Sequence, residues 1–322
     1  MVRYMSRKIL MALLTISIVF IINFILMRAA PGDPVSIMVG GIENVNPELR
    51  AVLEERYGFN EPIWTQLWIY LRQVLQGDLG TSYIYNRPVL DMIGGRMSQT
   101  IALGLASALL ALVIGTVMGI LSARREGGVF DRICSLFAYV FSAVPPFWLA
   151  LMLIILFASN LGWFPTFGMS SLRANYTGLA MIRDRLWHMA LPLSTLVLIA
   201  VPQYYRIAKT SMLQVANEDF VSTLRATGMR EGRIFYKYIF RNAILPTVTI
   251  FSITLAYLVT GVVFIEIVFS WPGMGSMMVQ AINTRDYTTL MGIYLMTSVS
   301  IALVMILVDL MYSALDPRIR LR

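Results

Sequence analysis

The chain has 322 residues, of which 57% are hydrophobic and 14% charged, and it carries a formal net charge of +8. A soluble protein of this length carries closer to a quarter charged residues. The composition therefore excludes an ordinary soluble protein and predicts a helical membrane protein. A single cysteine, Cys134, excludes an internal disulfide and a cysteine metal cluster.

Six apolar runs are long enough for the roughly 20 residues with which a helix crosses a bilayer. They cover residues 9–27, 99–123, 132–158, 187–207, 244–269 and 290–314. The first run exceeds the roughly 7–15 residues of a signal-peptide core, so we expect a retained span. Small residues in the second run permit close helix packing, namely Gly104, Ala108, Gly115 and Gly119. The sequence therefore predicts an all-α membrane protein with six transmembrane helices.

The distribution of lysine and arginine predicts the orientation of these spans. With both termini inside, the cytoplasmic segments carry a clear excess of bases over acids, whereas the external segments are neutral. This is the positive-inside pattern. The basic balance is therefore explained by topology and by contact with anionic lipid, and it gives no support to nucleic-acid binding.

An external segment, residues 29–98, separates the first two spans and carries two helix signals. Asn46 and Pro47 are predicted to begin the first helix, and Pro62 the second, which ends before Gly77. The second helix has an apolar face formed by Trp64, Leu67, Trp68, Leu71 and Leu75. This face indicates either a packed lid over the helix ends or a surface for an external partner. Interfacial tryptophans fit both interpretations.

Pro145 and Pro146 interrupt the third span, because proline removes a backbone donor from the helical ladder. The interruption is either a static kink or a hinge that lets the external half move. Polar residues that are candidates to line a cavity are Asn23, Ser142 and Gln203.

The longest polar interruption on the cytoplasmic side is residues 217–246. Asn217 is predicted to cap a short helix, and Gly228 to end it in a left-handed turn. The first turn carries Glu218 and Asp219, and one face carries Phe220, Val221 and Leu224. Residues 230–241 then mix bases with aromatics before the fifth span. This helix, turn and helix against a membrane face predict a docking surface that couples the chain to a partner.

Glu266 and Asp309 are the charges within the predicted spans. Such residues are costly in a membrane and suggest a functional role by default. Both lie near span ends, so a hydrogen bond to a neighbouring helix is at least as well supported as contact with a substrate. Proton coupling through these residues is the distinctive expectation for a secondary transporter.

The chain shows no pattern for catalysis or nucleotide binding. None of its three lysines, Lys8, Lys209 and Lys237, follows a glycine, so it has no GxxxxGK[ST] phosphate loop. His188 is the only histidine and has no companion ligand, so we expect a hydrogen bonder at the outer end of the fourth span rather than a metal ligand. We expect no catalytic residue, no metal and no cofactor in this chain, and any energy from ATP must enter through a partner.

Residues 217–246 resemble the EAA loop of permease subunits in binding-protein-dependent ABC importers, in the longer form of the peptide (dipeptide, oligopeptide, nickel) family. The matching features are Asp219-Phe220-Val221, the turn at Gly228, and Arg241-Asn242-Ala243-Ile244-Leu245-Pro246. The family usually shows Ala-Arg-Ala-Lys-Gly, whereas this chain has Leu224-Arg225-Ala226-Thr227-Gly228. The departure keeps the helix and removes the lysine.

Further matches resemble the B-type subunit of that family, in the right order over nearly the whole chain. They are Pro31-Gly32-Asp33-Pro34, Tyr57-Gly58-Phe59-Asn60-Glu61-Pro62, Gly77-Asp78-Leu79-Gly80-Thr81-Ser82-Tyr83, Val144-Pro145-Pro146-Phe147-Trp148-Leu149-Ala150, Glu266-Ile267-Val268-Phe269-Ser270-Trp271-Pro272-Gly273, Arg285-Asp286-Tyr287 and Asp316-Pro317-Arg318-Ile319-Arg320. Each match alone is weak, whereas the set is highly specific. C-type partner subunits generally lack the long external insertion.

The resemblance implies a bacterial cytoplasmic (inner) membrane protein that pairs with a C-type permease, two cytoplasmic ATPases and an external substrate-binding protein. ATP and Mg would be bound by the ATPases. The expected organisation is an N-terminus and first span at 1–28, a scoop-like insertion at 29–98, and a permease core at 99–322 with the coupling loop at 209–243.

The resemblance also implies two sets of site residues, and the polar, proline and charged residues of the spans give a third. The ATPase-coupling set is Glu218, Asp219, Phe220, Thr223, Leu224, Arg225, Ala226, Thr227 and Gly228. A scoop-like element at residues 46–82 implies binding-protein contacts by Asn46, Glu48, Trp64, Trp68, Gly80, Thr81, Ser82 and Tyr83. Candidates for the pathway or a hinge are Ser142, Pro145, Pro146, Gln203 and Glu266.

The sequence therefore predicts a non-catalytic permease subunit that forms half of the translocation pathway of an ATP-driven importer for di- or oligopeptides. Nickel chelates, glutathione or oligosaccharides are alternative substrates within the same family. An ATP-independent carrier or channel is an alternative of another class, which would be favoured by inverted repeats or mid-membrane charges. A structural or sensory membrane protein is a third class, in which the cytoplasmic loop would be a signalling dock.

Overall fold

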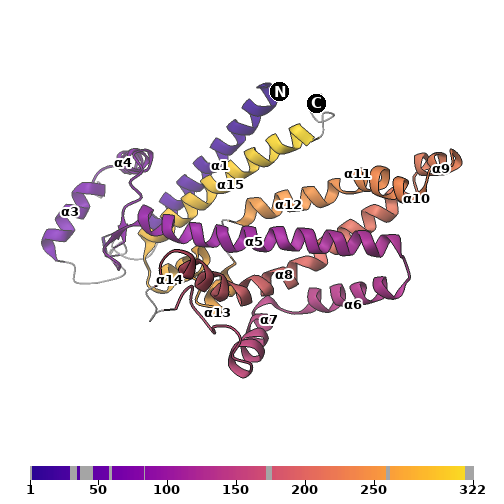
Figure 1. The fold of residues 1–322 in the computed structure, drawn as a ribbon. Coiled ribbons are helices and arrows are strands. Elements are labelled where there is room, and N and C mark those ends of the chain that lie inside the picture. The colour runs from indigo at the N-terminus through magenta and orange to yellow at the C-terminus, as the bar shows by residue number, and fades with distance from the viewer. Residues whose placement is uncertain are drawn as a thin grey trace. The chain divides into compact units, whose positions relative to one another are not determined.

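The structure is a computed structural model that describes residues 2–29, 35–36, 46–57, 60–82, 84–171, 176–258 and 262–315. These residues form helices and one short β-hairpin (Figure 1). They divide into two compact units. Unit 1 comprises Met1–Thr100, Val259–Val263 and Pro272–Arg322, and unit 2 comprises Ile101–Leu258 and Phe264–Trp271. The all-helical expectation is confirmed, and the hairpin is a small addition to it.

Unit 1 is built on two long helices, α1 (Val2–Ala29) and α15 (Tyr287–Leu315), that pack along each other (Figure 1). The Asn23 amide in α1 donates to the carbonyl of Met291 in α15 at 3.4 Å, and Asn23 is buried. Asn23 therefore joins two helices, which is a packing role rather than the cavity-lining role considered from the sequence.

The first part of the external insertion forms α3 (Pro47–Tyr57) and α4 (Ile63–Leu75), as predicted. The amide of Glu48 donates to the Asn46 side-chain oxygen at 3.0 Å, so Asn46 caps α3. Gly77 follows α4 with φ +79° and closes it with a left-handed turn. Local sequence rules were sufficient to place both helices.

The apolar face of α4 is largely exposed in this structure. Trp64 and Trp68 are 78% and 64% exposed, and Leu75 also faces outward. Tyr70 instead packs inward and stacks on Phe20 of α1, with ring centroids 4.7 Å apart. A lid packed through its tryptophans does not describe α4, because these side chains point away from the described fold.

The second part of the insertion is tied to the start of α15. The strands β1 (Thr81–Ser82) and β2 (Arg87–Pro88) form an antiparallel hairpin. The Ser82 hydroxyl donates to the Asp286 carboxylate at 2.5 Å, and the amide and hydroxyl of Thr289 donate to the same carboxylate at 3.1 and 2.7 Å. All three residues are buried. Two signature motifs that lie far apart in the sequence therefore meet at one carboxylate.

The core of unit 1 is formed where the N-terminal turns of α5 (Val89–Arg124) meet α14 (Met274–Asn283) and α15. Val89, Ile93 and Met274 are buried there. Gly292 allows this packing, since a Cβ at that position would lie 2.5 Å from a methyl group of Val89. These contacts fix the hairpin beside the helices of unit 1.

Unit 2 is organised around the approach of α5 to α8 (Gly178–Ala216). A Cβ at Gly115 would lie 2.7 Å from the carbonyl oxygen of Val201, and one at Gly119 would lie 2.7 Å from that of Tyr205. Only glycine permits this spacing, so the close packing predicted from the small residues is confirmed.

The predicted third span is broken at its proline pair. The helix α6 (Val129–Ala143) meets the run formed by α7 (Pro146–Leu153) and the π-helix η1 (Ile154–Asn160) at 105°. The backbone is extended at Pro145, and two successive prolines supply no amide donor. The interruption predicted at Pro145 and Pro146 is therefore confirmed, and the helix is broken there rather than continuous over residues 132–158.

The predicted fifth span also differs in its bounds. The short helix α10 (Glu231–Arg233), the π-helix η2 (Ile234–Ile239) and α11 (Phe240–Ala243) run into α12 (Leu245–Tyr257) with a bend of 40°. Residues 259–261 lie outside the described part of the chain, and α13 (Val263–Val268) follows. Within the described residues, four helices are long and apolar enough to cross a membrane, or up to six if each bent pair is one span.

Candidate coupling site

The predicted docking helix is present as α9 (Asp219–Ala226), which directly follows α8 (Figure 1). Asn217 does not cap it. Helix α8 continues to Ala216, and the Asn217 amide donates to the carbonyls of the last turn of α8. Glu218 is the residue that precedes the first turn of α9, without a side-chain capping bond. The predicted start was therefore wrong by one residue, because the preceding helix is longer than expected.

The end of α9 is a Schellman motif centred on Gly228. The Gly228 amide donates to the Arg225 carbonyl at 2.9 Å, and the Met229 amide donates to the Leu224 carbonyl at 3.4 Å. Gly228 has φ +76°, so the predicted left-handed turn is confirmed. The Thr227 hydroxyl also donates to the Leu224 carbonyl at 2.8 Å, which adds a bond at the position where the family carries lysine.

An ion pair brackets this turn. Arg225 Nε lies 2.8 Å from Glu231 Oε1 in α10, and both side chains are exposed. Exposed pairs of this kind contribute about 0–1 kcal/mol, so the pair orients α9 more than it stabilises it. This pair was not predicted, although opposite charges on either side of a turn glycine are a usable sequence signal.

The apolar face of α9 enters a buried cluster that we call the coupling core. Its members are Ala123, Met212, Val221, Ile234, Ile239 and Ala243. Val221 is fully buried there, and Phe220 and Leu224 pack against it, as their shared helical face predicted. Because the members come from α5, α8, α9, η2 and α11, the coupling core joins the docking helix to the ends of several long helices.

The opposite face of α9 is exposed. The predicted coupling residues that lie on it or beside it are Glu218, Asp219, Thr223, Arg225, Ala226, Thr227 and Gly228. Phe220 and Leu224 lie on the inner face instead. Ser222 is exposed next to Thr223 and was not named from the sequence. A short helix with an open outer face and a rigid back is suited to transmit a displacement.

A buried ion pair clamps α6 to α8 at the first residue of the coupling loop. Lys209 donates to the Asp131 carboxylate, which also accepts from the Tyr205 hydroxyl at 3.2 Å and from the Gly127 amide at 3.0 Å. Ser135 and Tyr205 share a further hydrogen bond of 2.8 Å. The sequence patterns excluded Lys209 from a phosphate loop and counted it as a cytoplasmic base, but they did not indicate this clamp, because Asp131 is distant in the chain.

The candidates for the pathway or a hinge do not gather at one place. Ser142 is exposed close to Pro145 and Pro146, and its hydroxyl donates to the Tyr139 carbonyl at 3.0 Å. Gln203 is exposed on α8, whereas Glu266 is fully buried in α13. The side chain of Asp309 lies outside the described residues.

The binding-protein candidates separate into exposed and buried groups. The exposed group is Asn46, Glu48, Trp64 and Trp68. Gly80 and Ser82 are buried, and the Ser82 hydroxyl is committed to Asp286, so these two offer no exposed surface. Thr81 is half-buried, and Tyr83 lies outside the described residues.

His188 is a hydrogen bonder, as predicted. Its Nδ1 lies 2.8 Å from the Asp184 carbonyl, one turn earlier in α8. Asp184 accepts from the amide and the hydroxyl of Ser171 at 2.8 and 2.6 Å. The serine is thus bonded to the carboxylate rather than to the imidazole, so these contacts anchor a loop to α8 and do not activate a nucleophile.

Comparison with known proteins agrees with this arrangement. Residues 115–321 match the family model of the binding-protein-dependent transport system inner membrane component, and residues 1–104 match its N-terminal companion. The oligopeptide transport system permease protein AppB of Bacillus subtilis (strain 168) is 35% identical over 320 residues, covering 99% of both chains. The dipeptide transport system permease protein DppB of Alkalihalophilus pseudofirmus is 34% identical over 334 residues, covering 99% of this chain and 100% of the relative.

A chain of the inward-facing MetNI methionine ABC transporter is similar in fold, with a TM-score of 0.54 and 18% identity. The match covers 70% of this chain and 96% of that one. The long apolar helices and these matches together define a membrane permease. The chain belongs to the family of binding-protein-dependent transport system inner membrane components. The resemblance to B-type permeases of the peptide family is thereby confirmed.

Proposed function

We propose that this chain forms half of the translocation pathway of an ATP-driven importer of di- or oligopeptides. The substrate class is supported by relatives that are named oligopeptide and dipeptide transport permeases and that match over their whole lengths. The coupling role is supported chiefly by the two faces of α9. Its inner face is buried in the coupling core, and its outer face is exposed.

The proposed topology has six spans, with each bent helix pair counted as one. Both termini and the coupling loop are cytoplasmic, and residues 29–98 are external, in agreement with the excess of bases on the inner segments. The membrane is the bacterial inner membrane. This topology puts α9 on the cytoplasmic side and α4 on the external side.

The proposed partners are a C-type permease, two ATPases that bind Mg-ATP, and an external binding protein. The outer face of α9 docks in a groove of one ATPase. When the ATPases close, α9 moves as a rigid body, and the coupling core carries the displacement to α5, α8 and α11. The Asp131–Lys209 clamp carries it to α6, which ends at the proline break. Access to the pathway then alternates between the two sides of the membrane.

The test is reconstitution of the four-subunit assembly and the binding protein in liposomes, with uptake of a labelled dipeptide measured with and without ATP. We expect uptake only with ATP and the binding protein. A variant with Val221→Asp, which puts a charge into the coupling core, should lose uptake, whereas Ser222→Asp on the outer side should leave the core intact and weaken docking alone. Uptake by this chain alone without ATP would favour the carrier alternative.

A further inference from the structure

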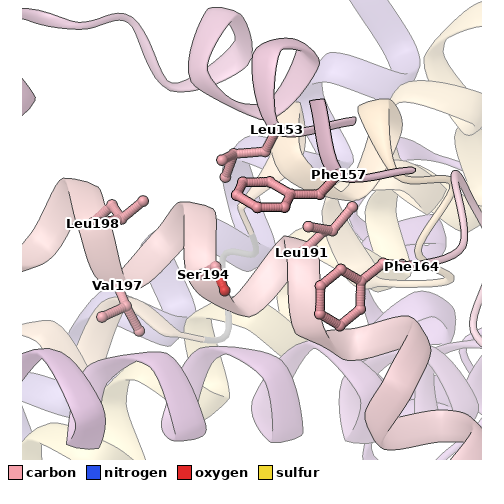
Figure 2. A pocket seen from close by; sticks show the side chains of 7 residues that line it. All are labelled: Leu153, Phe157, Phe164, Leu191, Ser194, Val197 and Leu198. Atoms are coloured by element: carbon pink, nitrogen blue, oxygen red, sulfur yellow. The ribbon is translucent and has the colours of Figure 1, made fainter. Parts of the chain in front are cut away.

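An apolar cavity of about 340 Å³ lies between the α7–η1 run and α8 in unit 2 (Figure 2). Its lining residues are Leu153, Phe157, Phe164, Leu191, Ser194, Val197 and Leu198. Figure 2 shows the Phe157 ring facing α8, with Leu191 and Ser194 opposite it. The π-helix η1 forms part of the wall, and π-helical turns occur frequently at functional sites. The coupling role proposed above does not use this cavity.

The loop beside the cavity is held in place by several contacts. The Trp163 amide donates to the Phe157 carbonyl at 2.8 Å, and the Trp187 indole donates to the Trp163 carbonyl at 2.8 Å. The Gly168 amide donates to the Phe269 carbonyl at 2.8 Å. Because the wall is fixed by these bonds, the cavity is a built feature of the fold rather than a gap in a mobile loop.

The apolar lining of the cavity favours a hydrocarbon ligand over a peptide. Ser194 supplies the one side-chain hydroxyl, and the other lining side chains are hydrocarbon. A peptide would bring backbone donors and acceptors that this lining leaves unpaired, which is unfavourable in an apolar site. A hydrocarbon chain brings no such groups and would regain the dispersion contacts that an empty cavity forfeits.

The position of the cavity along α8 agrees with a lipid. Trp163 and Trp187 are 57% and 45% exposed, and tryptophans of this kind mark the membrane–water interface. Leu191 and Leu198 lie 4 and 11 residues beyond Trp187, or about 6 and 17 Å along the helix. That range is the hydrocarbon region of one leaflet, since half of the apolar core is about 15 Å thick.

A basic residue, Arg183, precedes Trp187 by one turn on the same face of α8. Arg183 and Trp187 precede Leu191 by two turns and one turn, and the side chain of Arg183 is exposed. Arg185 lies between them on the opposite face of α8. The order along one face is therefore a cation, an interfacial aromatic and an apolar cavity, which matches the phosphate, the interface and the acyl chain of a phospholipid.

We propose that this face of α8 and the α7–η1 run bind one phospholipid of the outer leaflet, with its acyl chain in the cavity and its phosphate at Arg183. The leaflet assignment rests on the topology proposed above. Lipid binding itself does not depend on ATP or on the identity of the transported substrate. The bound chain would support the bent half of the third span against α8.

The experiment is photolabelling of the reconstituted assembly in liposomes of phosphatidylglycerol and phosphatidylcholine that contain a trace of phospholipid with a diazirine in its acyl chain. Photolabelling is carried out without ATP, and the labelled peptides are then mapped by mass spectrometry. Exposed apolar residues of α5, Leu109 and Val113, give the baseline for ordinary lipid contact. We expect labelling around Phe157 and Leu198 clearly above this baseline.

Two variants and one matched control decide the proposal. Arg183→Gln should lower labelling of the cavity about fivefold, the effect of losing one basic contact at a membrane surface. Leu198→Trp, which fills the cavity, should lower it as well, whereas Arg185→Gln should leave it unchanged. Labelling equal to the α5 baseline, or an equal fall with Arg185→Gln, would overturn the proposal.

A dipeptide that carries a photoreactive benzophenone side chain tests the remaining occupant. If it labels Phe157 or Leu198 and the lipid does not, the cavity is a substrate subsite and the lipid proposal is wrong. Because lipid labelling is read without transport, failure of uptake in the same liposomes would count against the proposed function alone.

Discussion

At the scale of single residues, the described chain uses one hydrogen-bonded turn repeatedly to end its helices. The left-handed residue of this turn is Gly77 after α4, Gly228 after α9, Ser270 after α13 and Arg285 after α14. Glycine takes this conformation without strain, whereas other residues pay about 1–2 kcal/mol for it. At Gly228 the turn sets the direction of the chain between α9 and α10, so its backbone conformation bears directly on the docking proposed for α9.

We expect Gly228→Val to preserve folding and membrane insertion but to uncouple ATP hydrolysis from uptake. A Cβ at Gly228 would meet nothing within 4 Å, so the effect acts through the positive φ alone. Gly232→Val is the matched control, because Gly232 also has open space around it and its φ is not positive. The measurement is the ratio of ATP hydrolysed to peptide taken up. Normal transport by Gly228→Val would disprove the proposed pivot.

At the scale of elements, the helices of unit 2 are joined by contacts between residues that are distant in the chain. The Asp131–Lys209 pair holds α6 to α8, and its side chains are 8% and 20% exposed. Removing one partner of a buried ion pair leaves a charge without compensation, whereas removing both charges is far less harmful. A buried ion pair between α6 and α8 therefore predicts that removing both charges is less destabilising than removing one of them.

We expect Lys209→Met to lower the free energy of unfolding by about 3–5 kcal/mol, since Asp131 then stays buried without its cation. Asp131→Asn combined with Lys209→Met should recover most of that loss, because the new amide oxygen can accept from the Gly127 amide while the amide nitrogen can donate to the Tyr205 hydroxyl. Unfolding is followed by titration with SDS, and Lys237→Met on the exposed side of η2 is the control. Equal losses in the single and the double variant would contradict a buried clamp.

The elements also show which features the sequence could predict. Asn46, Gly77 and Gly228 act on backbone groups within a few residues, so local rules placed three helix ends correctly. Ser82 bonds to Asp286 across most of the chain, and local patterns carry no information on that pairing. For this reason its motif was interpreted as surface, although Ser82 is buried. Pro145 and Pro146 predicted a break, whereas the angle of 105° depends on packing.

At the scale of the whole molecule, the proposed function requires two exposed surfaces that serve different partners. In the proposed topology, the outer face of α9 meets an ATPase and the tryptophan face of α4 meets the external binding protein. The candidate coupling residues were found from sequence because they resemble a family loop. The inner and outer faces of α9 became distinguishable only when the coupling core was seen to bury Val221.

The exposed tryptophans of α4 give a prediction that separates stability from partner binding. Because Trp64 and Trp68 are mostly exposed, Trp64→Ala with Trp68→Ala should leave the melting temperature of the assembly unchanged. The same variant should reduce stimulation of ATP hydrolysis by the binding protein about tenfold or more, since exposed tryptophans that become buried at an interface often dominate its energy.

The control for this prediction is Tyr70→Ala on the opposite side of α4, where the ring stacks on Phe20. It should lower the melting temperature while the tryptophan face keeps its chemistry. Titration of the binding protein against ATPase activity in nanodiscs measures the first effect, and thermal unfolding measures the second. If the binding protein stimulates ATP hydrolysis equally in the double tryptophan variant, this face of α4 contacts the membrane interface and not the binding protein, because interfacial lipid is the other environment that tryptophan favours.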